Sequence, residues 1–249
     1  MDSNNRIAIF TIVNKEEVFR GFVDSLETQK NVSFELFPIM NCHGEYSSAR
    51  HAYNEAATGK DFKYYVFSHP DIRFLDENAL YDIIGYIDSL GSFGVAGVAG
   101  AVRENRGRKI LTTILQGADK QSFGEQVNKP EQVQTLDECM FFVDKDYFNQ
   151  HPFSDTEGWH LYSVEYCLEA EGNQMKNYVV PSRIWHLSAG SSLDEKYMSQ
   201  LEKLISDYQD RYEVICTTVK AWPTKGAGCR IYRKYYWLKQ RIKRAVVRR

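Results

Sequence analysis

The chain has 249 residues, of which 43% are hydrophobic and 14% aromatic, so it can bury a sizeable core as one large domain. No run approaches the roughly 18 to 20 apolar residues of a membrane-spanning helix, and the start does not resemble an export signal, so we expect a cytoplasmic protein. The five cysteines are widely spaced and form no CxxC pair, which argues against a disulfide framework and against a zinc ribbon.

The formal net charge of −2 conceals an uneven distribution along the chain. Eleven of the 31 Lys and Arg residues follow Glu213, after which there is no Asp or Glu. The rest of the chain therefore carries 20 basic against 33 acidic residues, a net charge of −13. An acidic body precedes a basic tail.

The first ninety residues alternate between strand and helix patterns. The continuous apolar run at 6–14 is typical of a central parallel strand that is covered on both faces. The patterns that follow predict helices over 15–29, 47–57 and 77–90, and strands over 32–40 and 63–67. This order predicts a doubly wound α/β fold, with a mostly parallel sheet flanked by helices.

The second half has a less regular pattern. The glycine-rich run 94–100 predicts a buried strand in close backbone contact, and 103–108 predicts a polar loop. Short strands are expected at 139–143 and 178–180, a short helix over 164–171 and a long helix over 194–212. Because no repeat or linker interrupts the chain, we expect a single domain over 1–215 and a basic, aromatic appendage over 216–249.

The strand pattern at 63–67 runs into Ser68, His69, Pro70 and Asp71. Ligands of open α/β sheets bind at the carboxyl ends of strands, and a His and an Asp on a proline-stiffened turn can converge on a divalent cation or a diphosphate. Asp71 can instead cap a turn, and His69 can have a structural role. The tripeptide alone does not separate these alternatives.

Four further segments accompany this turn in a recognisable order: the helix pattern at 48–57, the strand pattern at 137–143, the segment 153–168 and the His-containing segment 185–191. Together they resemble the glycosyltransferase family 2-like group, especially its compact bacterial members with a His-x-Asp motif. The resemblance implies a GT-A fold. It also implies transfer of a sugar from a nucleotide-diphosphate sugar to an acceptor hydroxyl, with inversion, in the synthesis of a surface polysaccharide.

The same resemblance implies a metal site made by His69, Asp71 and His186. In ordinary members the strand ends in Asp-x-Asp, so His69 replaces the first acid. An imidazole nitrogen can bind Mn²⁺, whereas Mg²⁺ prefers oxygen ligands, so the ion and the need for it stay open. His69 can also donate a hydrogen bond to the diphosphate.

The substrates are expected to meet polar and aromatic residues. Glu165 is the predicted base that takes the proton of the acceptor hydroxyl, with Asp155 and Glu157 as rivals on the preceding loop. The alternative for Glu165 is a solvated acid that supports the helix dipole. The donor is expected to contact Thr11, Asn14, Asn41, Arg50, Asn54, His69 and Asp71, and the acceptor to contact Asp137, Glu138, Trp159, His160 and Tyr162.

The tail from Cys229 to Arg249 mixes basic residues with aromatic and aliphatic residues at helical spacing. This pattern is typical of an interfacial helix on anionic lipid. We therefore expect a peripheral protein on the inner face of the plasma membrane, with a saccharide or a lipid-linked acceptor. The acidic body and the lack of a nucleic-acid motif argue against nucleic-acid binding, and a solvated tail is the remaining alternative.

Two other functions are compatible with the same residues. A metal-dependent hydrolase would activate water instead of a sugar hydroxyl. A noncatalytic subunit would bind a nucleotide sugar without turning it over. Release of nucleoside diphosphate that depends on an acceptor separates transfer from both alternatives.

Overall fold

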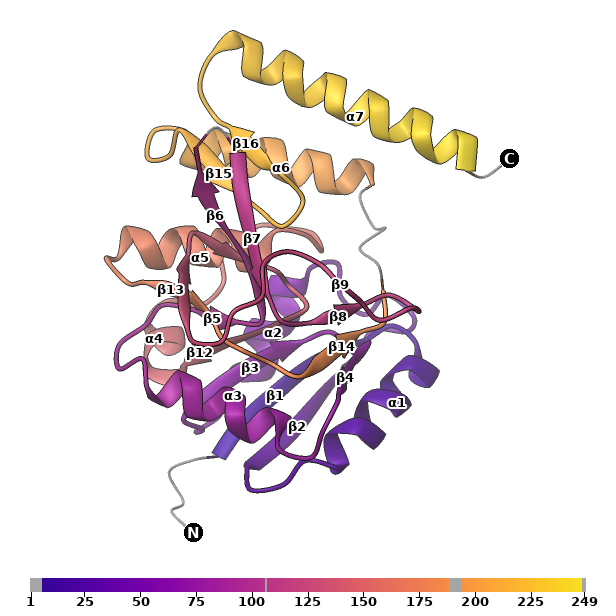
Figure 1. Ribbon diagram of the computed structural model, residues 1–249, viewed down its shortest axis with the longest axis vertical. Helices are drawn as coiled ribbons and strands as arrows, with labels where there is room; N and C mark the ends of the chain where they lie inside the picture. The colour runs from indigo at the N-terminus through magenta and orange to yellow at the C-terminus, as the bar shows by residue number, and fades with distance from the viewer. Residues whose placement is uncertain (1–5, 106, 189–193, 248–249) are drawn as a thin grey trace.

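The computed structural model describes residues 6–105, 107–188 and 194–247 (Figure 1). A seven-stranded sheet in the order β10-β13-β5-β12-β3-β1-β2 forms its centre. Strands β1, β2, β3, β5 and β13 point the same way, while β10 and β12 run opposite to them. The bounds are β1 Arg6–Val13, β2 Ser33–Met40, β3 Tyr64–Ser68, β5 Ala96–Gly97, β10 Glu131–Val133, β12 Met140–Asp144 and β13 Asn177–Val179. The prediction of a mostly parallel α/β sheet is confirmed.

Helices cover both faces of this sheet. Strand β1 is buried on both sides because its side chains alternate: Ala8 and Phe10 pack into one core, and Ile7 and Ile9 into the other. The first core receives α2 (Ala49–Ala57), α4 (Lys145–Gln150) and α5 (Tyr162–Gly172), and the second receives α1 (Glu16–Glu27) and α3 (Ala79–Asp88). The continuous apolar run at the start of the chain thus has the two-sided burial that its pattern predicts.

The described residues also form three smaller sheets, of three, four and two strands. One joins β11 (Thr135–Leu136), β6 (Ala99–Glu104) and β7 (Gly107–Thr112), and another joins β4 (Ile72–Phe74), β14 (Ile184–His186), β8 (Leu115–Gln116) and β9 (Gln121–Ser122). The predicted polar loop at 103–108 is wrong, because Arg103 pairs with Arg108 in the β6–β7 hairpin. The polar side chains of this segment show no strand pattern in the sequence. The hairpin is stabilised by backbone pairing and by the guanidinium of Arg108, which donates to the carbonyls of Thr217, Thr218 and Val219.

The C-terminal part of the chain builds a third core. Helix α6 (Glu195–Tyr208) packs with α5 and with the hairpin of β15 (Val214–Cys216) and β16 (Ala221–Pro223), where Trp222 is fully buried. This hairpin crosses the predicted boundary at residue 216, so the segment that extends beyond the body is helix α7 (Ala227–Val247). No helix among the described residues is both long enough and apolar enough to span a membrane.

Candidate functional site

The turn His69-Pro70-Asp71 connects the central strand β3 to β4. The backbone N–H of His69 donates to the carbonyl of Cys139 at 2.9 Å. Arg73 fixes the other side of the turn, because its guanidinium donates to the carbonyls of Pro70 and Ile72 and also to that of Val18 on α1. The turn is therefore held between the sheet and the start of the first helix.

His186 reaches the turn from a strand more than a hundred residues later in the chain. Strand β14 pairs with β4 in the antiparallel sense, with His186 opposite Ile72, and the N–H of Leu187 donates to the carbonyl of Asp71 at 2.9 Å. This register places the His186 side chain beside the Asp71 carboxylate. Ala189–Ser191, the end of the predicted His-containing segment, lie outside the described residues.

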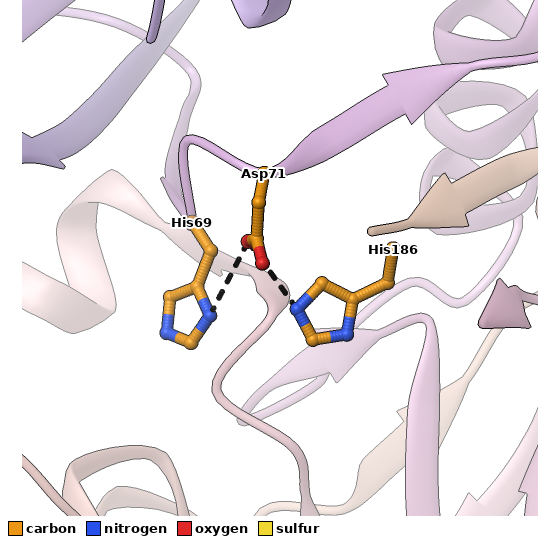
Figure 2. A group of neighbouring side chains, drawn as sticks. All are labelled: His69, Asp71 and His186. Atoms are coloured by element: carbon orange, nitrogen blue, oxygen red, sulfur yellow. Dashed lines mark ion pairs between the residues drawn. The ribbon is translucent and has the colours of Figure 1, made fainter. Parts of the chain in front are cut away.

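Figure 2 shows the Asp71 carboxylate between the two imidazole rings. Oδ1 of Asp71 lies 3.3 Å from Nε2 of His186 and 4.0 Å from Nδ1 of His69. Burial favours the neutral acid, but the hydrogen bond and charge of His186 outweigh it, so the pKa of Asp71 is lowered. Burial also opposes a charge on His186, yet its contact with Asp71 raises the His186 pKa; burial lowers the pKa of His69.

These three side chains suit a divalent cation. One ligand atom from each of His69, Asp71 and His186 lies within 4.8 Å of the others. Two imidazole nitrogens and a carboxylate oxygen match Mn²⁺ or another transition metal better than Mg²⁺, which prefers oxygen ligands throughout. The donor set therefore fits the predicted metal site. Hydroxyl Oγ of Ser188, at 3.0 Å from Nε2 of His186, is a further polar neighbour.

A cavity of about 560 Å³ opens beside this cluster at the carboxyl ends of β1 and β3. Of the residues predicted to bind substrate or metal, five line it: Asn14, His69, Asp71, Trp159 and Tyr162. Three polar or aromatic residues outside the predictions also line it, namely Lys15, Tyr53 and Ser188. Lys15 directly follows the predicted strand, and this position at a strand end was a signal that could have singled it out.

Three other predicted donor residues, Asn41, Asn54 and Thr11, do not line this cavity. The amide of Asn41 donates to the Asn14 side chain at 2.9 Å and so orients a residue of the cavity wall. Asn54 exchanges two hydrogen bonds with the backbone of Phe153, and its side chain belongs to a second cavity of about 330 Å³. Thr11 is fully buried, and its hydroxyl has no hydrogen-bond partner among the described residues.

Glu165 and Arg50 form a buried ion pair, and neither residue lines the 560 Å³ cavity. The carboxylate Oε2 of Glu165 lies 2.7 Å from Nε and 2.5 Å from Nη2 of Arg50, and Oε1 accepts hydrogen bonds from the hydroxyls of Ser154 and Thr156. Arg50 is 2% exposed and Glu165 is 7% exposed. Glu165 is therefore not a solvated helix-dipole acid, and both its oxygens are engaged.

The other two predicted acids lie on an exposed loop. Asp155 and Glu157 line the second cavity together with Ser48 and His51 at the start of α2. Oε2 of Glu157 accepts a hydrogen bond from the hydroxyl of Ser47 at 3.0 Å. This cavity adjoins the first across the N-terminus of α2, because Ala49 lines one and Ser48 the other.

Among the predicted acceptor residues, Glu138 binds the strained start of α5. Leu161 has a left-handed backbone, with φ 61°, and the next N–H, from Tyr162, donates to Oε1 of Glu138 at 2.9 Å. Burial of the carboxyl group and the charge of Asp137 raise the pKa of Glu138 to about 8. The phenol of Tyr162 lies 3.3 Å from Nε2 of His69, which connects this helix start to the cluster.

Two further acceptor predictions have their polar atoms engaged within the protein. Asp137 accepts hydrogen bonds from the hydroxyl of Thr218 at 2.6 Å and from the N–H of Cys139 at 3.1 Å. His160 lies 3.4 Å from the carboxylate of Asp194, the N-cap of α6. Neither residue lines the main cavity, so their predicted contact with the acceptor remains a prediction.

The central sheet, its flanking helices and the cluster of His69, Asp71 and His186 after the carboxyl end of β3 define a GT-A fold. Two crystal structures of S. aureus TarS share this architecture: one has a TM-score of 0.56 and 11% identity over 82% of this chain and 40% of TarS, and the other, of TarS 1–349, has a TM-score of 0.53 and 10% identity over 82% and 66%. Likeness at this level of identity shows the fold alone.

Comparison of the sequence with protein families assigns the chain to a family as well as to a fold. The model of a family described as "Glycosyltransferase like family" matches residues 8–208, and the chain belongs to this family. A Fuscovulum blasticum protein named "ATP synthase subunits region ORF 6" is 26% identical over 156 residues, which are 59% of this chain and 60% of that protein. The chain thus matches less than two thirds of the length of this relative.

Proposed function

We propose that this protein transfers a sugar from a nucleotide-diphosphate sugar to a hydroxyl of a saccharide or lipid-linked acceptor, with inversion, in the synthesis of a surface polysaccharide. The observation that carries the proposal is the cluster of His69, Asp71 and His186 on the wall of the 560 Å³ cavity. Family membership supports the class of reaction. The acceptor, the inversion and the pathway are parts of the proposal.

The cavity wall offers groups for each part of the donor. His69, Asp71 and His186 would hold a divalent cation, and such an ion would supply positive charge for the departing diphosphate. Lys15 adds a positive charge at the start of α1, and Asn14 offers an amide that Asn41 holds in place. Trp159 and Tyr162 present aromatic surface to a sugar ring.

Transfer with inversion also needs a base for the acceptor hydroxyl. Glu165 remains the predicted base, although its oxygens contact Arg50, Ser154 and Thr156. Asp155 and Glu157 remain the alternatives, and they line the adjoining cavity, which is open to an acceptor. Substitution of these three acids in parallel decides among them.

The test begins with a thermal-shift screen of nucleotide sugars with and without Mn²⁺, because a ligand that binds the native state raises its stability. The stabilising donor is then assayed for nucleoside diphosphate release with a panel of saccharide acceptors. Asp71→Asn should lower acceptor-dependent turnover by roughly 10²-fold or more, as expected when charge that stabilises the leaving group is lost. It should also abolish the Mn²⁺-dependent thermal shift.

Asp207→Asn is the matched control, since Asp207 forms an exposed i,i+4 ion pair with Lys203 on α6, away from the cavity. It should leave turnover and the thermal shift unchanged. Sugar release at the same rate without any acceptor would instead indicate a hydrolase. Donor binding without turnover for any acceptor would indicate a noncatalytic subunit.

A further inference from the structure

One face of helix α7 packs against the body of the protein. The guanidinium of Arg233, which is 4% exposed, binds both carboxylate oxygens of Glu202 on α6 at 2.7 Å and donates to the carbonyl of Pro223 at 3.0 Å. The ring of Tyr236 packs edge-on against Trp222 with centroids 5.2 Å apart. These contacts hold the first half of the helix in one rotational setting.

The two helices run antiparallel. Arg233 pairs with Glu202, and Arg241, two turns later, lies 3.6 Å from Glu195, two turns earlier on α6. The second half of α7 therefore lies toward the N-terminus of α6. Figure 1 shows α7 as the outermost layer, with α6 between it and the main sheet.

The opposite face of α7 is apolar and exposed. Ile231, Tyr235, Leu238 and Ile242 are 70%, 64%, 55% and 57% exposed. Their spacing of four, three and four residues places them in one stripe, because an α-helix turns once every 3.6 residues. Within the described side chains, the large exposed hydrophobic residues outside α7 are Met40 at the end of β2, Leu75 in the loop after β4 and Tyr81 on α3. The stripe is thus the main apolar patch of the described surface.

Positive charge flanks this stripe. With 100° between successive residues, Lys234 falls on one side of the stripe and Lys239 on the other, and both are exposed. Arg230 and Arg241 add charge on the Lys234 side, and the helix contains no acidic residue. An apolar stripe bordered by Lys and Arg matches the boundary between acyl chains and anionic headgroups. The apolar patch of similar size that a second copy of this chain offers on its described surface is the same stripe, whose border carries the same positive charge, so pairing two stripes brings like charges together.

The N-terminal end of α6 lies near the cavity. Asp194, the N-cap of α6, contacts His160, and the neighbouring Trp159 lines the 560 Å³ cavity. The antiparallel α7 extends toward this end of α6, so a surface bound by α7 lies on the side where the cavity wall meets α6.

From the stripe, its basic border and this placement, we propose that α7 binds an anionic lipid surface in the plane of the interface. The binding does not depend on sugar transfer. Ile231, Tyr235, Leu238 and Ile242 enter the headgroup region, while Arg233 and Tyr236 keep the helix on the body. The surface is recognised by negative charge combined with accessible acyl chain, which a soluble polyanion lacks.

The test is sedimentation of the full-length protein with vesicles of phosphatidylcholine alone and of phosphatidylcholine with phosphatidylglycerol. The wild-type protein should bind the anionic vesicles and lose most of this binding when salt screens the charges. Ile231→Gln, Tyr235→Gln, Leu238→Gln and Ile242→Gln, combined in one chain, should weaken binding by more than about ten-fold, since the apolar insertion is lost while the charge is kept. Gln retains good helix propensity, and circular dichroism checks the fold.

The matched control replaces Met40 and Tyr81, exposed on β2 and α3, by Gln. This variant should bind anionic vesicles like the wild type. Equal binding by the wild type and the four-residue variant would overturn the proposal, as would equal binding to both kinds of vesicle. Loss of a dimer in the four-residue variant, with no vesicle binding by the wild type, would assign the stripe to self-association instead.

Discussion

Glu165 is the predicted base, but its carboxylate is engaged in a buried ion pair with Arg50. A buried charge left without its partner is costly, so Glu165→Gln and Arg50→Met should each lower the free energy of unfolding by about 3–5 kcal/mol. The double variant should be no less stable than the worse single variant, because the two changes share one interaction. Denaturant unfolding of the four proteins measures this cycle.

Turnover of the same variants decides the role of Glu165. If Glu165 only positions α2 against α5, both single variants should lose activity to a similar degree once the folded fraction is taken into account. A loss of roughly 10²-fold or more at Glu165→Gln that Arg50→Met does not share is the size expected of a base. Asp155→Asn and Glu157→Gln should then raise the acceptor concentration for half-maximal rate without a comparable fall in turnover.

Glu138 makes the stability of the fold depend on pH. Its pKa is raised from the ordinary 4.5 to about 8, so between these values the folded protein holds a proton that the unfolded chain has released. This contribution to stability is complete below pH 4.5 and is lost as pH rises toward 8. Glu138→Gln should remove that dependence, because its amide oxygen can still accept the N–H of Tyr162.

The measurement is the free energy of unfolding of the wild type and of Glu138→Gln from pH 5 to pH 8, for which the folded and unfolded pKa values set the window. The wild type should lose stability relative to the variant as pH rises. A difference that stays constant over this range would contradict the raised pKa.

At the scale of elements, the β15–β16 hairpin belongs to the body although most of it lies within the predicted appendage. Trp222 is fully buried, and its indole N–H donates to the hydroxyl of Thr217 at 3.2 Å. Trp222→Ala should lower the free energy of unfolding by about 3–5 kcal/mol, the usual result of emptying a large core site. Tyr235→Ala, on the exposed face of α7, should change it by about 0.5 kcal/mol or less, as is normal for surface positions. Equal effects in thermal or denaturant unfolding would place the boundary where the sequence predicted it.

The whole molecule combines an acidic body with a basic outer helix. Within the body, the sequence predicts the long elements better than the short strands. The patterns of β1, α1, β2, α2 and β3 were predicted with their bounds nearly correct, because long runs of buried side chains impose a period on the sequence. Of the strands of two or three residues, β5 and β13 fall at the strands predicted over 94–100 and 178–180, whereas β8, β9 and β14 were not predicted as strands. They are too short to show a period, and distant pairing stabilises them.

For the candidate site, the sequence by itself determined which residues are able to act: a His and an Asp at the end of a central strand, a late His, and the acids of 155–165. Only the tertiary structure decided which of them meet. The register of β14 on β4 brings His186 to Asp71, and the packing of α2 on α5 joins Arg50 to Glu165 instead of leaving that acid at the cavity wall. The physical reason is that local periodicity reports burial, whereas the contacts between segments far apart in the chain depend on strand register and helix packing, which no local pattern encodes.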